Sequence, residues 1–357
     1  MISELKKLDN IYKERSDKQN ANYRSGKSMS GLKNLHFKPA AHFLKNVKGK
    51  VGILFHKDGD GACSAAQIIH YLKSKKITPE LFCGEYEESA VAPFVSADLD
   101  YYIILDMATD LIGNWFGPIE GKPVLIIDHH IAKDLTPLGY VHLNPRFVNP
   151  EEYISAAEIV GELFNHMKLP GKPWVSRLGG VCDRSIKIQD ASEQEQKASD
   201  IIDSVRAVQK EEGITKLAKF LAVAKNLEEF LFEDKFQKSH EQLWNEVDRQ
   251  IGEYELQAVG DINFFELRGN FSLTSILVNR LFEIYPKRTI IVYRNTPHGY
   301  KFSGRSNNYD LSVAFENATR GLGNGGGHPK ASGGKTNDFA KVRKRILEEF
   351  KKQDKKK

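Results

Sequence analysis

The strongest constraint on the fold is a short apolar run that ends in charged side chains. Residues 124–127 (Val-Leu-Ile-Ile) are followed at once by Asp128, His129 and His130. An apolar run without polar alternation is typical of a strand that is buried on both faces, as in a parallel sheet. Charged groups at its carboxyl end are expected in the crevice where open α/β sheets bind ligands.

The same pattern occurs twice upstream, where two further apolar runs begin at Val51 and Tyr101. The acidic and histidine side chains that end or follow these runs are His56, Asp58, Asp60 and Asp106. Helical patterns separate the runs, and this alternation predicts a parallel sheet with helices on both faces. A helix over 174–185 is expected to carry Asp183 at its far end.

The length of 357 residues suits two domains with a connector. We predict an α/β fold with a parallel-sheet domain, a helical connector and a second, smaller α/β domain. The expected divisions are a basic N-terminal extension (1–50), the parallel-sheet domain (51–190), the connector (191–260), the second domain (261–345) and a basic tail (346–357). The segment 321–334 is read as a glycine-rich turn.

Composition narrows the class of protein. No stretch approaches the ~20 apolar residues of a membrane span, and the N-terminus lacks an apolar signal core, so we expect a cytoplasmic protein without a membrane partner. The three cysteines, Cys63, Cys83 and Cys182, lack the spacing of a zinc site. The net charge is +5, with Lys and Arg concentrated near both ends. Basic ends fit a nucleic-acid partner, and equally fit solvated, partly disordered tails.

The acidic and histidine side chains at the strand ends predict a metal site. Several carboxylates that share a small crevice raise one another's pKa unless cations neutralise them. Carboxylate and imidazole without thiolate favour Mn²⁺-type ions, and two ions ~3.5–4 Å apart would suit phosphoryl transfer. Each piece also has an ordinary explanation: Asp58 and Asp60 could cap a helix, and the histidines could be surface residues. Their coincidence on three strands favours the site.

Four segments resemble the successive motifs of the DHH phosphoesterases: HKDGDG (56–61), LDMATD (105–110), IIDHH (126–130) and GGVCDRS (179–185). Two later segments, GRSNNYDLSVAFE and GNGGGHPKASGG, resemble the domain that accompanies DHH in RecJ-like nucleases and in oligonucleotide and cyclic-dinucleotide phosphodiesterases. Together these segments cover roughly residues 50–190 and 260–340.

The resemblance implies a role for each matching residue. His56 and Asp58 would bind one metal ion, Asp60, His129 and Asp183 would bind a second, and Asp106 would bridge them. His130 would contact the scissile phosphate, and Asp128 would orient the histidines. Many family members carry the first His at the position of Leu54 here, whereas RecJ-like members often have a ligand at the position of His56. The implied cofactor is two Mn²⁺ ions, with Mg²⁺ or Co²⁺ as substitutes.

In the second domain, consecutive glycines free the backbone to approach an anion, and an arginine at a strand end offers a planar fork for phosphate. The residues expected to bind substrate there are Arg305, Asn307, Gly325, Gly326, Gly327 and His328. Asn308 could assist. The alternative is a glycine-rich hairpin in which His328 packs structurally.

The leading hypothesis is a Mn²⁺-dependent exonuclease that hydrolyses single-stranded nucleic acid, 5′→3′ as RecJ-like enzymes do. A second hypothesis is a phosphodiesterase for short oligonucleotides or cyclic dinucleotides. A third, of another class, is a non-catalytic scaffold that binds DNA replication or repair proteins. All the expected ligand positions are filled in this chain, which disfavours the scaffold.

Overall fold

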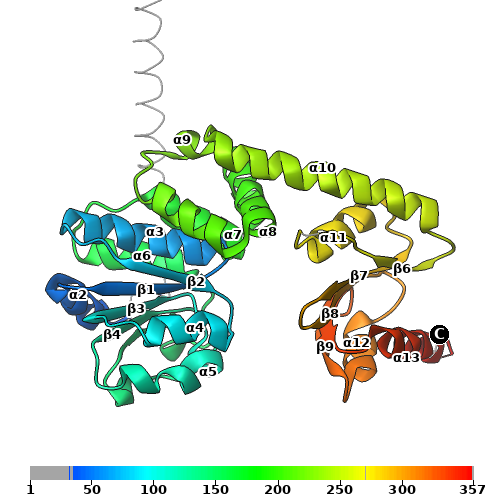
Figure 1. Cartoon of the computed structure of the whole chain (residues 1–357), viewed down its shortest axis with the longest axis horizontal. Helices are drawn as coiled ribbons and strands as arrows, with labels where there is room; N and C mark the ends of the chain where they lie inside the picture. The colour runs from blue at the N-terminus through cyan, green and yellow to red at the C-terminus, as the bar shows by residue number, and fades with distance from the viewer. Residues whose placement is uncertain (1–31, 33–34, 270, 356–357) are drawn as a thin grey trace, which may run out of the picture. The chain divides into compact units, whose positions relative to one another are not determined.

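A computed structural model describes residue 32, residues 35–269 and residues 271–355 (Figure 1). The chain divides into two compact units, with the boundary between His240 and Glu241. Most of the basic N-terminal extension that the sequence predicts, and the last two residues of the basic tail, lie outside the described residues.

The first unit is built on a five-stranded parallel sheet, as the apolar runs predict. The strand order is β2-β1-β3-β4-β5, and every neighbouring pair is parallel. The strands are β1 (Val51–His56), β2 (Glu80–Gly84), β3 (Tyr101–Leu105), β4 (Val124–Ile127) and β5 (Val141–Leu143). At three residues, β5 is too short for a recognisable sequence pattern.

Helices cover both faces of this sheet (Figure 1). One face carries α2 (Phe37–Asn46), α3 (Gly59–Ser74), α6 (Ala156–His166), α7 (Pro173–Asp183) and α8 (Glu193–Leu221). The other carries α4 (Glu88–Val95), α5 (Thr109–Ile112) and the 3₁₀ turns η2 (Gly113–Trp115) and η3 (Gly117–Ile119). Ile103 packs into the first core and Ile104 into the second, and both are fully buried. Burial on both faces explains why the strands lack polar alternation.

Helix α2 belongs to the first unit although it falls within the segment 1–50. Its residues Ala40 and Leu44 are fully buried in the core shared with α3 and α6. The domain boundary predicted at residue 50 therefore separates this helix from the core into which it packs. The apolar face of α2 is short and follows a polar, lysine-rich stretch, so composition alone places it outside the domain.

The segment from 191 to 260 is helical, as expected. It contains α8, α9 (Leu227–Leu231) and α10 (Asp234–Gln257). Helix α8 packs against α3 in the first core, so it is part of the first unit rather than a free connector. Its regular geometry is interrupted at Lys210, where φ is 56°. Among the described helices, none combines the length and apolar character needed to cross a membrane.

The second unit contains a mixed sheet in the order β6-β7-β8-β10-β9. Its strands are β6 (Ile262–Glu266), β7 (Thr289–Thr296), β8 (Gly299–Arg305), β9 (Gly323–His328) and β10 (Ala331–Thr336). Only β6 and β7 run parallel to each other among the paired strands of this sheet's described residues. Its helices are α11 (Thr274–Ile284), α12 (Leu311–Thr319) and α13 (Phe339–Asp354). Ile346 and Phe350 of α13 are buried, so the predicted tail begins inside this helix.

The glycine-rich segment 321–334 forms the hairpin of β9 and β10, which the sequence analysis gave as the alternative to a turn, although His328 is exposed rather than packed. Helix α12 packs close to it: a Cβ built at Gly325 would lie 2.9 Å from the Phe315 carbonyl oxygen. A Cβ at Gly334 would lie 2.6 Å from the Phe302 ring. Glycine is therefore required here by close packing, and the sequence signal of a turn arises from residues that form strands.

The two-sided burial of the first sheet predicts a large stability difference between two isoleucines. Ile126 in β4 is fully buried, so Ile126→Ala should lower the free energy of unfolding by about 2–5 kcal/mol. Ile131, just beyond β4, is 82% exposed, and Ile131→Ala should change it by no more than about 0.5 kcal/mol. Urea unfolding of the two variants measures both values. Equal losses would contradict the described packing of β4.

Candidate metal centre

The predicted site residues gather at the carboxyl edge of the first sheet, where β1, β3 and β4 end side by side. His56 is the last residue of β1, Asp106 follows β3, and Asp128, His129 and His130 follow β4. Because the strands are parallel and adjacent, their ends deliver these side chains to one place.

Asp58 and Asp60 reach the same place from the start of α3. Asp58 is the N-cap of this helix and accepts a hydrogen bond of 3.0 Å from Gly61 N, so the capping role considered from the sequence is real. Both carboxylate oxygens of Asp60 accept hydrogen bonds from the start of α6, from Ala156 N at 2.7 Å and Ala157 N at 2.8 Å. The helix N-terminus thus holds Asp60 in position and favours its charge.

Asp106 lies at the centre of the cluster in a strained backbone conformation. Its φ is +57°, in the left-handed region that non-glycine residues rarely adopt. Its amide donates to the Ile127 carbonyl oxygen at 2.9 Å, which continues the ladder between β3 and β4. The side chain is 2% exposed. Such strain persists only where surrounding structure enforces it, and it is concentrated at functional sites.

The carboxylate of Asp106 lies close to histidines from two strands. Its Oδ1 is 3.2 Å from His129 Nε2 and 3.9 Å from His130 Nδ1. Its Oδ2 is 3.8 Å from His56 Nδ1. Asp183, at the end of α7, lies 3.8 Å from the other nitrogen of the His129 ring. Asp106 is therefore placed to serve both sides of the cluster.

Within the described residues, the ligand atoms form three overlapping groups, each with its atoms within 4.8 Å of one another. The groups are His56, Asp58 and Asp106; Asp60, His129 and Asp183; and Asp106, His129 and His130. All six residues expected to hold metal are brought together. The first two groups divide them as the resemblance implies, with Asp106 in contact with both.

Burial and like charge perturb the acids strongly. Burial, reinforced by the charges of Asp58 and Asp60, raises the pKa of Asp106 well above its ordinary range. Burial raises the pKa of Asp60 to about 7 and also raises that of Asp183. His56 shows the opposite balance: burial lowers its pKa, but hydrogen bonds to Asp58 and Glu85 outweigh burial and bring it to about 11. The cluster carries more negative charge than its own histidines offset.

Several buried polar atoms of the cluster have no hydrogen-bond partner within the described part of the chain to offset the cost of their burial. Among the described side chains, Asp106 Oδ2, His129 Nδ1, Asp183 Oδ2 and Asp128 Oδ2 are buried without a hydrogen-bond partner. Buried polar groups are costly unless paired. Three of these four atoms belong to residues of the metal-binding groups. Carboxylate and imidazole donors without thiolate fit a divalent ion such as Mn²⁺ better than a structural zinc ion.

Asp128 orients His130 rather than joining a ligand group. It is fully buried, and its Oδ1 lies 2.8 Å from His130 Nδ1. Burial alone would raise its pKa, but the hydrogen bond with His130 outweighs burial and lowers it. His130 is 34% exposed, whereas His129 is 3% exposed. The pair therefore presents one buried imidazole and one that reaches solvent.

The end of β2 contributes two residues that the sequence analysis missed. Glu85 Oε2 accepts from His56 Nε2 at 3.4 Å, which lowers the pKa of Glu85 to about 2, and its other oxygen lies 3.5 Å from Lys57 Nζ. The ring of Tyr86 stacks on His56, and its hydroxyl lies 3.3 Å from His130 Nε2. The feature that could have identified these two residues is their position directly after β2, a fourth parallel strand that ends at the same edge of the sheet.

The segment after β5 anchors the two histidines through their backbone. Asn144 Nδ2 donates to the His130 carbonyl oxygen at 2.9 Å, and Arg146 Nε donates to that of His129 at 2.7 Å. The Tyr153 hydroxyl donates to the Asp183 carbonyl oxygen at 2.9 Å. These three residues were also missed, because main-chain hydrogen bonds leave no motif in a single sequence.

The residues expected to bind substrate in the second unit lie at one end of its sheet. Arg305 in β8 and His328 in β9 both lie opposite Ala331 of the intervening β10. Arg305 Nε donates to Asn279 Oδ1 at 2.7 Å, so part of its guanidinium is already used. Asn307 Nδ2 donates to the Pro286 carbonyl oxygen at 3.1 Å and holds a turn. The residues Gly325, Gly326 and Gly327 lie in β9, and His328 is exposed.

Two domain families match the chain by sequence. The DHH family, N-terminal domain, matches residues 50–178, and the DHHA1 domain matches residues 263–355. No curated protein sequence matches the chain. The two family matches enclose the three strand ends of the site and the glycine-rich hairpin.

Solved structures of low sequence identity share the fold. RecJ from Thermus thermophilus, in complex with Mn²⁺, is 15% identical with a TM-score of 0.63, and the match covers 90% of this chain and 55% of that one. An exonuclease RecJ bound to manganese is 15% identical with a TM-score of 0.62, over 88% and 94% of the two chains. A pGpG-specific phosphodiesterase from Vibrio, PggH, is 14% identical with a TM-score of 0.52, over 85% and 99%. The chain thus spans about half the length of the Thermus RecJ.

The raised carboxyl pKa values predict how metal binding depends on pH. The folded, metal-free chain binds the Asp60 proton more tightly than the unfolded chain, so this residue costs stability as pH rises from about 4 to about 7. Metal must also displace that proton at low pH. We therefore expect Mn²⁺ to raise the melting temperature more at pH 7.5 than at pH 5.5, as measured by calorimetry. An equal rise at both values would contradict the shift.

Removing the central charge should separate stability from metal binding. Asparagine tolerates the left-handed backbone of Asp106 and carries no charge. In metal-free protein, Asp106→Asn should raise the melting temperature at pH 7.5, by about 2–4 °C for each kcal/mol released. The gain should vanish below about pH 3, where the carboxyl is protonated in both the folded and the unfolded state. Mn²⁺ should no longer stabilise the variant. Asp98→Asn, at an exposed carboxylate, is the matched control and should respond to Mn²⁺ like wild type.

Proposed function

Since the chain belongs to the DHH family of metal-dependent phosphoesterases, we propose that it hydrolyses phosphodiester bonds of single-stranded nucleic acid. In this proposal it is a Mn²⁺-dependent exonuclease that removes nucleotides in the 5′→3′ direction. Support for a nuclease comes from the structural similarity to two RecJ proteins, one of them described as an exonuclease bound to manganese.

The observation that carries the proposal is the uncompensated cluster around Asp106. Five buried or half-buried carboxylates converge on three histidines, and buried oxygen and nitrogen atoms of the cluster lack partners. If the cluster had only a structural role, its unpaired buried charges would destabilise the fold and serve no purpose, because buried charges are normally paired. The cluster is what two divalent cations would neutralise.

The residues that would hold the metal follow from the groups of ligand atoms. His56 and Asp58 would hold one ion, Asp60, His129 and Asp183 the other, and Asp106 would contact both. Bound divalent ions supply Lewis acidity and make water a stronger nucleophile at neutral pH. Mg²⁺ or Co²⁺ could replace Mn²⁺ with this donor set.

His130 is the imidazole that would meet the substrate. It is more exposed than His129, and its Nδ1 is held by Asp128, so its orientation is set before substrate binds. Its Nε2 lies beside the Tyr86 hydroxyl, at 3.3 Å. In the proposed reaction this edge of the ring faces a nonbridging oxygen of the scissile phosphate, while the contact between Nδ1 and Asp128 keeps the ring in place.

The second unit would hold the part of the substrate that is not cleaved. Arg305 keeps its Nη2 free of hydrogen bonds within the described residues, so one arm of the guanidinium remains for a phosphate oxygen. Glycines 325–327 expose backbone of β9, an edge strand without side chains in the way. His328 and Asn307 flank this end of the sheet and complete the proposed anion contacts.

A second candidate function is cleavage of short oligonucleotides or cyclic dinucleotides. The similarity to a pGpG-specific phosphodiesterase, over 99% of that chain, favours it. The two functions use the same cluster and differ in how the strand beyond the scissile bond is held. Long strands should depend on the basic segments and therefore on salt.

A panel of substrates with Mn²⁺ tests the proposed function. It compares a long single strand labelled at either end, a dinucleotide and a cyclic dinucleotide, at low and moderate salt. We expect stepwise loss of nucleotides from the 5′ end of the long strand, suppressed by salt. Cleavage of the short substrates alone would replace the nuclease with the second candidate. Absence of hydrolysis of every substrate would contradict both.

Variants in the same panel test the roles of the cluster. Asp106→Asn and His129→Asn should lower kcat/KM by at least about 10³-fold, as expected when several kcal/mol of transition-state stabilisation are lost. Asp98→Asn should keep wild-type activity. Full activity of Asp106→Asn would show that hydrolysis takes place elsewhere.

A further inference from the structure

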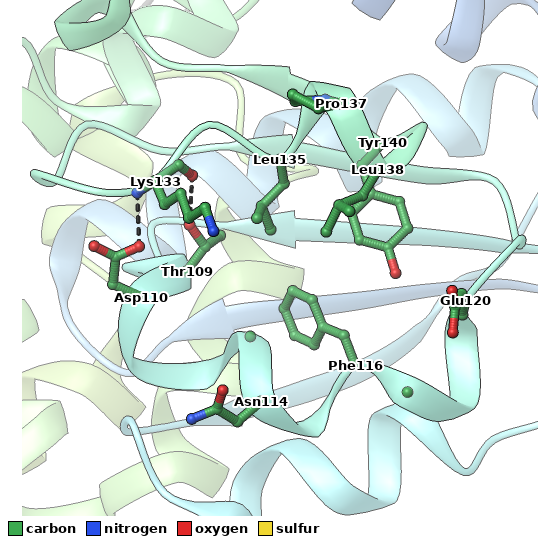
Figure 2. A pocket seen from close by; sticks show the side chains of 12 residues that line it. Thr109, Asp110, Asn114, Phe116, Glu120, Lys133, Leu135, Pro137, Leu138 and Tyr140 are labelled. Atoms are coloured by element: carbon green, nitrogen blue, oxygen red, sulfur yellow. Dashed lines mark hydrogen bonds between the residues drawn. The ribbon is translucent and has the colours of Figure 1, made fainter.

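A pocket of about 650 Å³ opens on the α4 and α5 side of the first sheet (Figure 2). It lies between the segment 109–120, which contains α5, η2 and η3, and the segment 133–140, which precedes β5. Its volume is in the range of about 300–1,000 Å³ that is usual for small-molecule sites. None of the predicted site residues lines it.

The floor of the pocket is apolar and aromatic. Phe116, Leu135 and Tyr140 are 3%, 8% and 7% exposed and are held in the core of this face. The rings of Phe116 and Tyr140 pack edge to face with centroids 6.3 Å apart. In Figure 2, Phe116 from the segment 109–120 faces Leu135 and Tyr140 from the segment 133–140. Their few exposed atoms are apolar, and an apolar lining with polar groups around it is usual for small-molecule sites.

The rim is polar and carries more negative than positive charge. Asp110, Asn114, Glu120 and Lys133 are all exposed there. Asp110 is held in place because its Oδ1 accepts from Lys133 N at 2.6 Å. Two carboxylates disfavour a phosphate inside the pocket, whereas carboxylate and amide groups match the amino and carbonyl edge of a nucleobase.

The two segments that line the pocket follow closely in sequence after residues of the metal-binding cluster. Thr109 comes three residues after Asp106, and Lys133 comes three residues after His130, so each lies within about 11 Å of the cluster along the chain. The Thr109 hydroxyl donates to the Lys133 carbonyl oxygen at 3.4 Å and joins the two segments. Lys133 Nζ has no ion pair within the described residues, and Lys133 stands on the segment that follows His130, where a phosphate linking the two sites would need a cation.

We propose that this pocket binds the base of the nucleotide next to the scissile phosphate, with Lys133 contacting the phosphate that links them. The inference rests on the proposed function and adds a base-recognition site to it. The apolar floor takes the face of the base, and Asn114 and Glu120 meet its polar edge. One strand could then place a phosphate at the cluster and a base in the pocket.

Two glycines in the wall allow the pocket to be filled. A Cβ built at Gly113 or at Gly117 would meet no atom within 4 Å, and neither residue has a positive φ. Both glycines line the pocket and have open space around a Cβ, so a bulky side chain can be introduced there without displacing the fold. Gly171, between α6 and α7, offers a matched control in the same unit, because a Cβ there makes only ordinary contacts of 3.8 Å and more with Phe164.

The test combines Gly117→Trp with single strands that carry one abasic nucleotide at successive positions. In wild type, an abasic nucleotide next to the scissile phosphate should lower kcat/KM about tenfold, within the range for one base–aromatic contact. Gly117→Trp should lower kcat/KM for the intact strand by a similar factor and lose the sensitivity to the abasic position. Gly171→Trp should behave as wild type, and Gly113→Phe repeats the test if Gly117→Trp is unstable.

A small substrate separates the possible failures. Bis(p-nitrophenyl) phosphate needs the cluster but no neighbouring base, so Gly117→Trp should hydrolyse it at the wild-type rate. If Gly117→Trp cleaves the intact strand like wild type, or keeps the abasic penalty, the base site is refuted while the nuclease stands. If wild type hydrolyses bis(p-nitrophenyl) phosphate but no strand, the proposed nucleic-acid substrate is itself refuted, and the base site with it.

Discussion

The burial of negative charge at one edge of a parallel sheet is the constraint on which the site depends. Asp60, Asp106 and Asp128 are almost inaccessible, and Asp58 and Asp183 lie beside them. The fold meets part of this cost with its own groups: a helix N-terminus supplies two amides to Asp60, and His130 pairs with Asp128. Asp106 receives no comparable compensation at Oδ2 within the described residues. Cations bound at this edge would neutralise the remaining charge, and their binding would then be coupled to the stability of the first unit.

The architecture makes this concentration of charge feasible. The strands β1, β3 and β4 are buried on both faces, so the side chains along them must be apolar. Ionisable groups can therefore gather only at the strand ends. Asp106 is held in a left-handed conformation while its amide still bonds to Ile127. The strain fixes where this carboxylate points, which a free loop could not do.

The features predicted correctly from the sequence are those that a local pattern encodes. Unbroken apolar runs indicated the parallel sheet, and the polar residues directly after them, such as Asp106 and His129, lie at its carboxyl edge as that pattern predicts. The features that were missed depend on tertiary contacts. Glu85 and Tyr86 follow a strand whose own residues are only partly buried, so the run that precedes them is weak. The glycines of β9 and β10 resemble a turn in sequence, yet Gly325 is required by the close approach of α12, a tertiary contact.

The smallest strand of the first sheet has an effect out of proportion to its length. In β5, the Leu143 carbonyl oxygen accepts a hydrogen bond from Asp128 N, and the residues just beyond it, Asn144 and Arg146, bond to the carbonyl oxygens of His130 and His129. All three consecutive residues of the DHH motif are thereby fixed through the main chain by one neighbouring segment. These bonds use only main-chain atoms of the motif. The side chain of Asp128 therefore remains available to bond to His130, and the side chain of His129 remains available to face Asp106. The motif supplies the chemistry, and the edge strand supplies the geometry that makes it usable.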